Sequence, residues 1–160
     1  MNGREVHSVE NTNPKAFTNV RVFAGDKSRP AADASYRNLS WENFYVDHSF
    51  NVGTKILKNK EIGTIDIWGP FFRVSFDLII HSLNRGVVFS SLLAFRGNGA
   101  TCNKCELGDR IPALWLKNNG FMQISNNVND LHEGILFKIK LNHWYKFIIE
   151  QKYAKKEVRK

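Results

Sequence analysis

Cysteine and long apolar segments are both scarce in this chain. Its 160 residues include two cysteines, yet a chain of this length can bury a hydrophobic core without metals or many disulfides. No apolar run approaches the length of about 20 residues that crosses a bilayer, and residues 1–5 lack the apolar core of a signal peptide. We therefore expect one soluble domain without membrane insertion, a description that also fits a module excised from a secreted protein.

The residue patterns of known catalytic sites are also missing. The histidines are scattered, and no G-x-S-x-G, H-E-x-x-H or phosphate-cradling loop accompanies them. Some glycosidases with a β-sandwich fold use a set of spaced carboxylates for catalysis, and this pattern is absent as well. We expect no catalytic residues and no enzyme activity, with a sandwich hydrolase as a minor alternative.

Short strands of alternating polarity are abundant. In residues 71–81 one face is apolar, which is typical of a half-buried strand, and it consists of Phe72, Val74, Phe76, Leu78 and Ile80. Further strand-length runs occupy residues 20–23, 87–95, 113–116, 122–125, 135–141 and 145–149, with turn signals at residues 84–86, 97–99, 118–120 and 141–143. No window has sustained helical periodicity. These patterns predict an all-β, two-sheet antiparallel jelly-roll sandwich, with a small-residue loop at residues 30–35.

Several segments resemble concanavalin A-like and laminin G-like modules of invertebrate extracellular proteins. The stretch NPKAFTNVRVFAGD at residues 13–26 and the tract ASYRNL at residues 34–39 resemble the closing strands of such a module, and NGREV at residues 2–6 resembles the segment that leads into them. The stretches FRVSFDL, GDRIPALW and WYKFIIEQ resemble its earlier strands. The resemblance implies a jelly-roll fold and an extracellular location.

The order of these segments departs from the family. The closing strands lie in residues 1–43 and the earlier strands in residues 44–153, before a basic tail at residues 154–160. A hairpin can be cut at its turn and the old termini joined without loss of core burial. We therefore expect one domain in circularly permuted order, or cut out of phase from tandem repeats, with residues 144–153 paired antiparallel to residues 1–9. In the tandem-repeat version, the segment before Asn43 completes a neighbouring chain.

The cysteine pair and one sequon have a chemical interpretation. Cys102 and Cys105 have the spacing of a redox pair or of half a zinc site, but there is no second cysteine pair and the surroundings are a Gly-rich loop. A structural disulfide is the preferred interpretation, with inert thiols as the alternative. Asn38 begins a glycosylation sequon, which matters only if the chain is secreted and the site exposed.

Calcium is the one cofactor that the sequence leaves open. Related sandwiches often hold a calcium ion at the sheet rim, bound by Asp, Asn and backbone oxygens. Asp109, Asn126 and Asp130 are weak candidates for such a site, although Asn and Asp are also common turn formers. We expect no cofactor, with calcium as the alternative.

The net charge of +8 makes polyanions plausible partners. Candidate ligand-binding residues are Lys146, Lys152, Lys155, Lys156 and Arg159, although a solvated terminal charge run is the simpler interpretation of most of them. Nucleic acid is not expected, because no exposed aromatic residues alternate with basic ones. The four tryptophans, Trp41, Trp68, Trp115 and Trp144, are predicted to lie in the core.

Together these patterns favour binding over catalysis. We expect a non-catalytic, extracellular adhesion or carbohydrate-recognition module for a glycan, acidic glycans included, or for an extracellular protein. Recognition would use a sheet face or the rim loops at residues 97–108 and 126–133. The alternative is a structural matrix module that forms homo-oligomers through edge strands or strand exchange.

Overall fold

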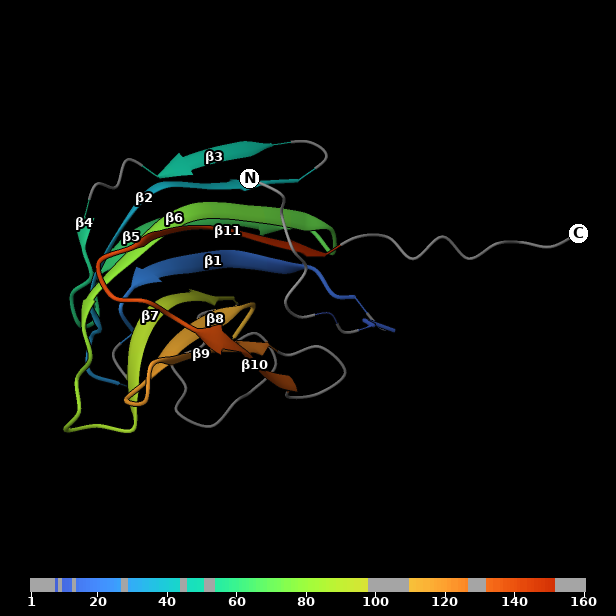
Figure 1. Cartoon of the computed structure of the whole chain (residues 1–160). Coiled ribbons are helices and arrows are strands. Elements are labelled where there is room, and N and C mark those ends of the chain that lie inside the picture. The colour runs from blue at the N-terminus through green and yellow to red at the C-terminus, as the bar shows by residue number, and fades with distance from the viewer. Residues whose placement is uncertain are drawn as a thin grey trace, which may run out of the picture.

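The computed structural model describes residues 8, 10–12, 14–26, 29–43, 46–50, 54–97, 110–126 and 132–151. In these residues every regular element is a β-strand and none is a helix (Figure 1). The strands are β1 (Phe17–Ala24), β2 (Asp33–Glu42), β3 (Asp47–Phe50), β4 (Thr54–Lys55), β5 (Glu61–Trp68), β6 (Phe72–Ser82), β7 (Phe89–Arg96), β8 (Ala113–Lys117), β9 (Phe121–Asn126), β10 (His132–Lys138) and β11 (Trp144–Gln151). The predicted all-β class is confirmed.

The strands form two antiparallel sheets. The first sheet has six strands in the order β10-β9-β8-β7-β1-β5, and the second has five, with β11-β6-β2-β3 in order and β4 paired to β2. Both β1 and β2 lie between two neighbours of the same chain. The chain is therefore a two-sheet β-sandwich, as the alternation predicts, while jelly-roll connectivity stays a prediction.

Alternation along β6 decides which of its side chains enter the core, whereas β7, β8 and β9 bury consecutive residues on both faces. In β6, Val74, Phe76, Leu78 and Ile80 are each at most 2% exposed, which confirms the predicted buried face for these residues, while Phe72 is partly buried against the core. Between the sheets, the ring of Trp68 lies 5.4 Å from the ring of Trp41. Burial of such large apolar side chains is the main favourable term in folding.

Aromatic contacts close both sides of the sandwich. On one side, the ring of Phe137 in β10 lies 5.5 Å from that of Tyr145 and 5.9 Å from that of Phe147, both in β11. On the other side, Phe50 of β3 packs over Gly63 of β5, where an added Cβ would lie 2.6 Å from the Phe50 ring. A glycine is required there because no other side chain fits beneath the ring.

Three details of the predicted chain path need correction. Residues 30–35 are not wholly a loop, because β2 begins at Asp33, and the strands β3, β4 and β5 were not predicted from alternation. The turn at residues 118–120 closes the β8–β9 hairpin, with Gly120 at a φ of 85°. The turns at residues 84–86 and 141–143 instead connect the two sheets. Turn signals specify a change of direction, but not whether the next strand joins the same sheet.

The permutation hypothesis concerns segments that lie mainly outside the described residues. β11 pairs with β6 along its length, and the predicted partners of β11, residues 1–9, include only Ser8 among the described residues. Asn11 Nδ2 donates a hydrogen bond to Gln151 Oε1 at 2.8 Å, which places the N-terminal segment beside the end of β11. The pairing itself, and with it the permutation, stays a prediction.

Candidate ligand-binding face

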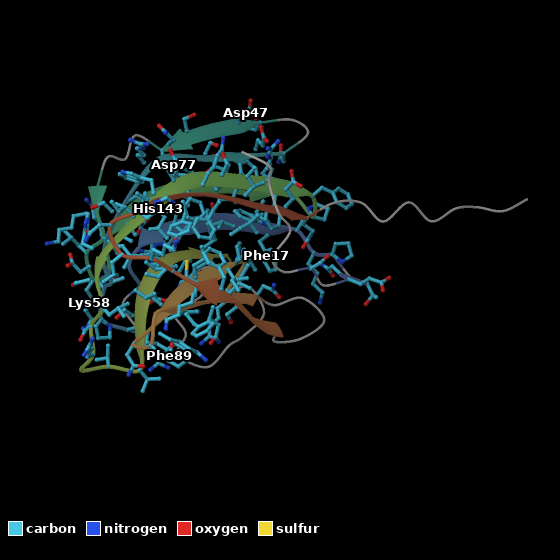
Figure 2. The ribbon with its side chains drawn as sticks, viewed as in Figure 1. Phe17, Asp47, Lys58, Asp77, Phe89 and His143 are labelled. Atoms are coloured by element: carbon cyan, nitrogen blue, oxygen red, sulfur yellow. The ribbon has the colours of Figure 1, made fainter. Side chains whose placement is uncertain are left out.

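Alternate residues of β11, β6 and β2 point away from the core and form the outer face of the second sheet, on which Figure 2 labels Asp77. Directly paired residues of an antiparallel sheet project to the same side. Two neighbouring rows therefore cross this face, Trp144, Ile79, Ser35 and Lys55 in one, and Lys146, Asp77 and Arg37 in the next. These two rows are called the Trp144 face.

The centre of the Trp144 face is an indole ring held by a guanidinium group. The Arg37 guanidinium carbon lies 4.2 Å from the centroid of the Trp144 ring, a cation–π contact. Asp77 Oδ2 accepts a hydrogen bond from Arg37 Nε at 3.2 Å and another from Asn38 Nδ2 at 2.8 Å. Asp77 thereby fixes the guanidinium over the ring, while Trp144 remains 37% exposed.

Asn38 reaches Asp77 because of an irregularity in β2. The register between β2 and β6 shifts between Arg37 and Ser40, and Asn38 has a φ of 55°. Asparagine tolerates this left-handed conformation better than most residues. The irregularity lets two consecutive side chains of β2 approach the same carboxylate, which a regular strand would place on opposite faces.

The Trp144 face carries more cations than carboxylates. Lys55 and Lys146 are exposed, and neither ammonium group has a side-chain partner among the described residues. Only the Nε of Arg37 is bonded to Asp77, so its two terminal nitrogens remain as donors. Against these three cations the two rows contain one carboxylate, Asp77. The local field therefore favours an anionic group.

The opposite end of the same face is neutralised internally. Arg73 Nε lies 3.4 Å from a carboxylate oxygen of Glu42 and 3.4 Å from one of Glu150. This cation already has two anionic neighbours, so it attracts an external anion less than Arg37 does. The contrast between Arg37 and Arg73 confines the candidate site to the Trp144 face.

The exposure of Trp144 contradicts the prediction that all four tryptophans lie in the core. Trp41, Trp68 and Trp115 are at most 5% exposed, as predicted. Trp144 has the same strand parity as Lys146 and projects outward, whereas Phe147 has the opposite parity and is buried. The alternation of polar and apolar residues within residues 144–151 is enough to predict that Trp144 points outward. The sequence does not predict that Arg37 and Asp77 lie beside it, because that depends on strand pairing.

Of the predicted site residues, Lys146 belongs to the Trp144 face. Asn38 borders it in β2, and its Nδ2, the atom that would carry a glycan, donates to Asp77. Asn126 ends β9 on the other sheet, opposite His132. The remaining predicted residues lie outside the described residues, namely Cys102, Cys105, Asp109, Asp130, Lys152, Lys155, Lys156 and Arg159.

The described residues contain no group of three or more His, Cys, Asp or Glu side chains that could hold a metal ion. Two of the three calcium candidates, Asp109 and Asp130, are not among the residues searched. The calcium alternative therefore stays a prediction, and a calcium titration followed by melting temperature tests it.

The outer face of the first sheet is less open than the Trp144 face. Phe23 and Trp115 form a small second cluster there with two alanines, and they are 6% and 5% exposed. Arginines cover these rings: the guanidinium carbon of Arg21 lies 5.0 Å from the Phe23 centroid, and that of Arg110 lies 5.5 Å from the Trp115 centroid. These aromatic rings are too buried to serve as stacking surfaces.

Comparison of the chain with known proteins identifies no relative. No family model, no curated protein and no solved structure matches the chain. Among the described residues, no helix is long and apolar enough to cross a membrane.

Proposed function

We propose that this domain is a non-catalytic, extracellular recognition module and that the Trp144 face binds an acidic glycan. The observation that supports the proposal best is the partly exposed Trp144 ring with the Arg37 guanidinium over it and with Lys146 in the neighbouring row of the same face. Indole rings combine apolar area with low conformational freedom, which suits them to binding surfaces.

The two chemical parts of an acidic sugar match the two parts of the face. The exposed part of the indole can pack against the C–H groups of a pyranose ring, and the terminal nitrogens of Arg37 can donate to a carboxylate or sulfate. Charge-assisted hydrogen bonds of this kind are about twice as strong as neutral ones. Lys146 lies in the same row as Arg37 and adds a second cation for the same group.

Asp77 has a positioning role in this proposal. It accepts hydrogen bonds from Arg37 and Asn38 and so holds the guanidinium before ligand arrives. A group that is ordered in advance loses less entropy on binding. The pre-formed arrangement therefore supports recognition rather than a chance surface contact.

The direct test is a calorimetric titration of the full chain with hyaluronan, heparin and neutral maltodextrin oligosaccharides. We expect binding of at least one acidic oligosaccharide and none of the neutral one. Arg37→Gln should weaken binding about tenfold or more, since loss of one charge-assisted contact is typically about 1.5–3 kcal/mol. Trp144→Ala should weaken it by a similar factor, because it removes the apolar area that packs against the sugar ring.

Two control substitutions lie on the same sheet. Ile148→Ala removes an exposed apolar residue of β11, and Arg73→Gln removes the internally paired cation, and both should bind like the wild type. The proposal would be overturned if the control variants lost as much affinity as the Trp144 and Arg37 variants, or if neither acidic oligosaccharide bound. A defined oligomer in size-exclusion chromatography without glycan binding would favour the self-association alternative.

A further inference from the structure

A second surface, which adjoins the Trp144 face at Lys55 and Trp144, lies at the end of the sandwich towards which β1 runs. The loops at residues 56–60, 83–88, 118–120 and 139–143 lie at this end, called here the loop end (Figure 1). Figure 2 labels Lys58, Phe89 and His143 there. The antiparallel register places these loops together, because β5 and β7 begin, and β8 ends, beside or beyond the end of β1.

Direct contacts hold these loops in place. The Leu57 N–H donates to the Ala24 carbonyl, which ties the loop at residues 56–60 to the end of β1. The Asn118 N–H donates to the Val88 carbonyl, and the Ile139 N–H donates to the Gly120 carbonyl, so the other three loops contact one another. Gly120 also lies against the side chains of Leu83 and Lys138, within 3.8 Å of an added Cβ.

Three of the loops present an aliphatic side chain to solvent. Leu57 is 50% exposed, Val88 is 62% exposed and Leu141 is 44% exposed. Single exposed apolar residues are ordinary on a protein surface. Three of them lie in loops at the same end of the molecule, and this favours a shared apolar partner.

Cations surround these aliphatic tips. The basic residues of the loop end are Arg29, Lys58, Lys60, Arg85, Lys117 and Lys140, all exposed or half-buried. Lys58, Arg85 and Lys140 have no side-chain partner among the described residues. Of the carboxylates described at this end, Asp26 is paired with Arg96 and Glu61 with Arg21, while Asp33 accepts a hydrogen bond from the neutral Ser82 hydroxyl and keeps its charge, so the cations still outnumber the unpaired carboxylates. The loop end is therefore strongly positive.

We propose that the loop end docks on an anionic lipid surface, with Leu57, Val88 and Leu141 entering the headgroup boundary and the surrounding cations contacting lipid phosphates and carboxylates. The exposed apolar side chains suit the apolar acyl-chain boundary of a bilayer, and the Lys and Arg residues of the same end suit its anionic headgroups. A second copy of the chain would present the same positive charge and be repelled. A soluble polyanion would match the cations but would leave the aliphatic tips in water. The docking is peripheral and involves no spanning segment.

The test is co-sedimentation of the full chain with vesicles of phosphatidylcholine alone and of phosphatidylcholine mixed with phosphatidylserine. We expect binding only to the mixed vesicles. Removing cations in Lys58→Gln, Arg85→Gln and Lys140→Gln, singly and combined, should weaken binding about fivefold for each charge. The triple variant Leu57→Ser, Val88→Ser and Leu141→Ser should weaken it roughly tenfold or more, because these side chains would no longer leave water.

The matched control is the double variant Val46→Ser and Ile67→Ser. These residues are 47% and 67% exposed but belong to the opposite end of the sandwich, so binding should be unchanged. All substituted side chains are exposed, and unchanged urea midpoints would show that the variants remain folded. Absence of binding to the mixed vesicles would overturn the proposal. Wild-type binding by the Leu57, Val88 and Leu141 variant would also overturn it, since charge alone would then explain the attraction.

Discussion

Tyr36 is a core residue with a buried hydroxyl. The residue is 2% exposed in the middle of β2, and among the described residues its hydroxyl has no hydrogen-bond partner. A buried polar group without a partner loses its hydration and gains nothing in return. The same burial raises the pKa of the Tyr36 phenol, because the charged phenolate is the form that loses most on leaving water.

Removal of this hydroxyl should therefore not lower the free energy of unfolding at neutral pH. We expect Tyr36→Phe to leave the free energy of unfolding unchanged or to raise it by about 1 kcal/mol. Above the ordinary tyrosine pKa of about 10, the unfolded chain loses the Tyr36 proton and the folded chain keeps it, so the wild type loses stability as pH rises. In urea unfolding measured above pH 10, the free energy of unfolding of Tyr36→Phe should therefore fall less with rising pH than that of the wild type.

Tyr145 supplies the control for this experiment. Its hydroxyl oxygen accepts a hydrogen bond from the Lys140 backbone N–H at 2.7 Å. Tyr145→Phe should lower the free energy of unfolding at neutral pH by about 1 kcal/mol. A larger loss in Tyr36→Phe than in Tyr145→Phe would contradict the interpretation of the Tyr36 hydroxyl.

At the scale of elements, a buried ion pair joins the end of β1 to the end of β7. Arg96 of β7 donates to Asp26, which lies two residues after the end of β1 at Ala24, and the two side chains are 6% and 3% exposed. The Asp26 N–H donates to Ser91 Oγ at 2.8 Å. Gly25 has a φ of 88°, and an added Cβ there would lie 2.4 Å from the Leu57 carbonyl oxygen. The chain thus leaves β1 along a path with little freedom.

Breaking this pair should be costly. We expect Asp26→Asn to lower the free energy of unfolding by about 3 kcal/mol or more, because Arg96 would keep an uncompensated buried charge. The neighbouring pair of Arg21 and Glu61 is the exposed counterpart, with side chains 46% and 35% exposed. Glu61→Gln should cost less than about 1 kcal/mol. Equal losses for the two variants in chemical denaturation would contradict the assigned role of Asp26.

For the whole molecule, the net charge of +8 should govern how acidic ligands approach. Long-range attraction raises association rates and weakens as salt screens it, with a Debye length of about 10 Å at 0.1 M. We expect the affinity for acidic oligosaccharides to fall with added sodium chloride. Trp144→Ala should lower affinity by a similar factor at every salt concentration, whereas Arg37→Gln combined with Lys146→Gln should flatten the salt dependence. Calorimetry over a salt series measures both, and salt-independent binding by the wild type would contradict a charge-based site.

Much of the fold was predictable from residues 71–81 and similar runs. Their alternation is a local property, since neighbouring side chains of a strand always point to opposite faces, and it predicts both the strand and its buried side. The strands β3 and β4 were not found because they are short, and β5 because its exposed and buried residues alternate irregularly. Their positions depend on contacts with other strands, such as Phe50 over Gly63.

The sequence by itself determined that this chain is all-β, that alternate residues in the stretch 71–81 are buried, and that its net charge is +8. Only the tertiary structure decided which polar residues meet. Arg37, Asp77 and Trp144 come from three strands far apart in the chain, and strand pairing brings them into adjacent rows. The same holds for the loop end, because the strand register places the loops of Leu57, Val88 and Leu141 at one end of the sandwich. The periodicity of side chains along a strand is a local property of the sequence, whereas the pairing of strands joins residues that are far apart in the chain. Both proposed surfaces depend on strand pairing, so the sequence alone could not show them.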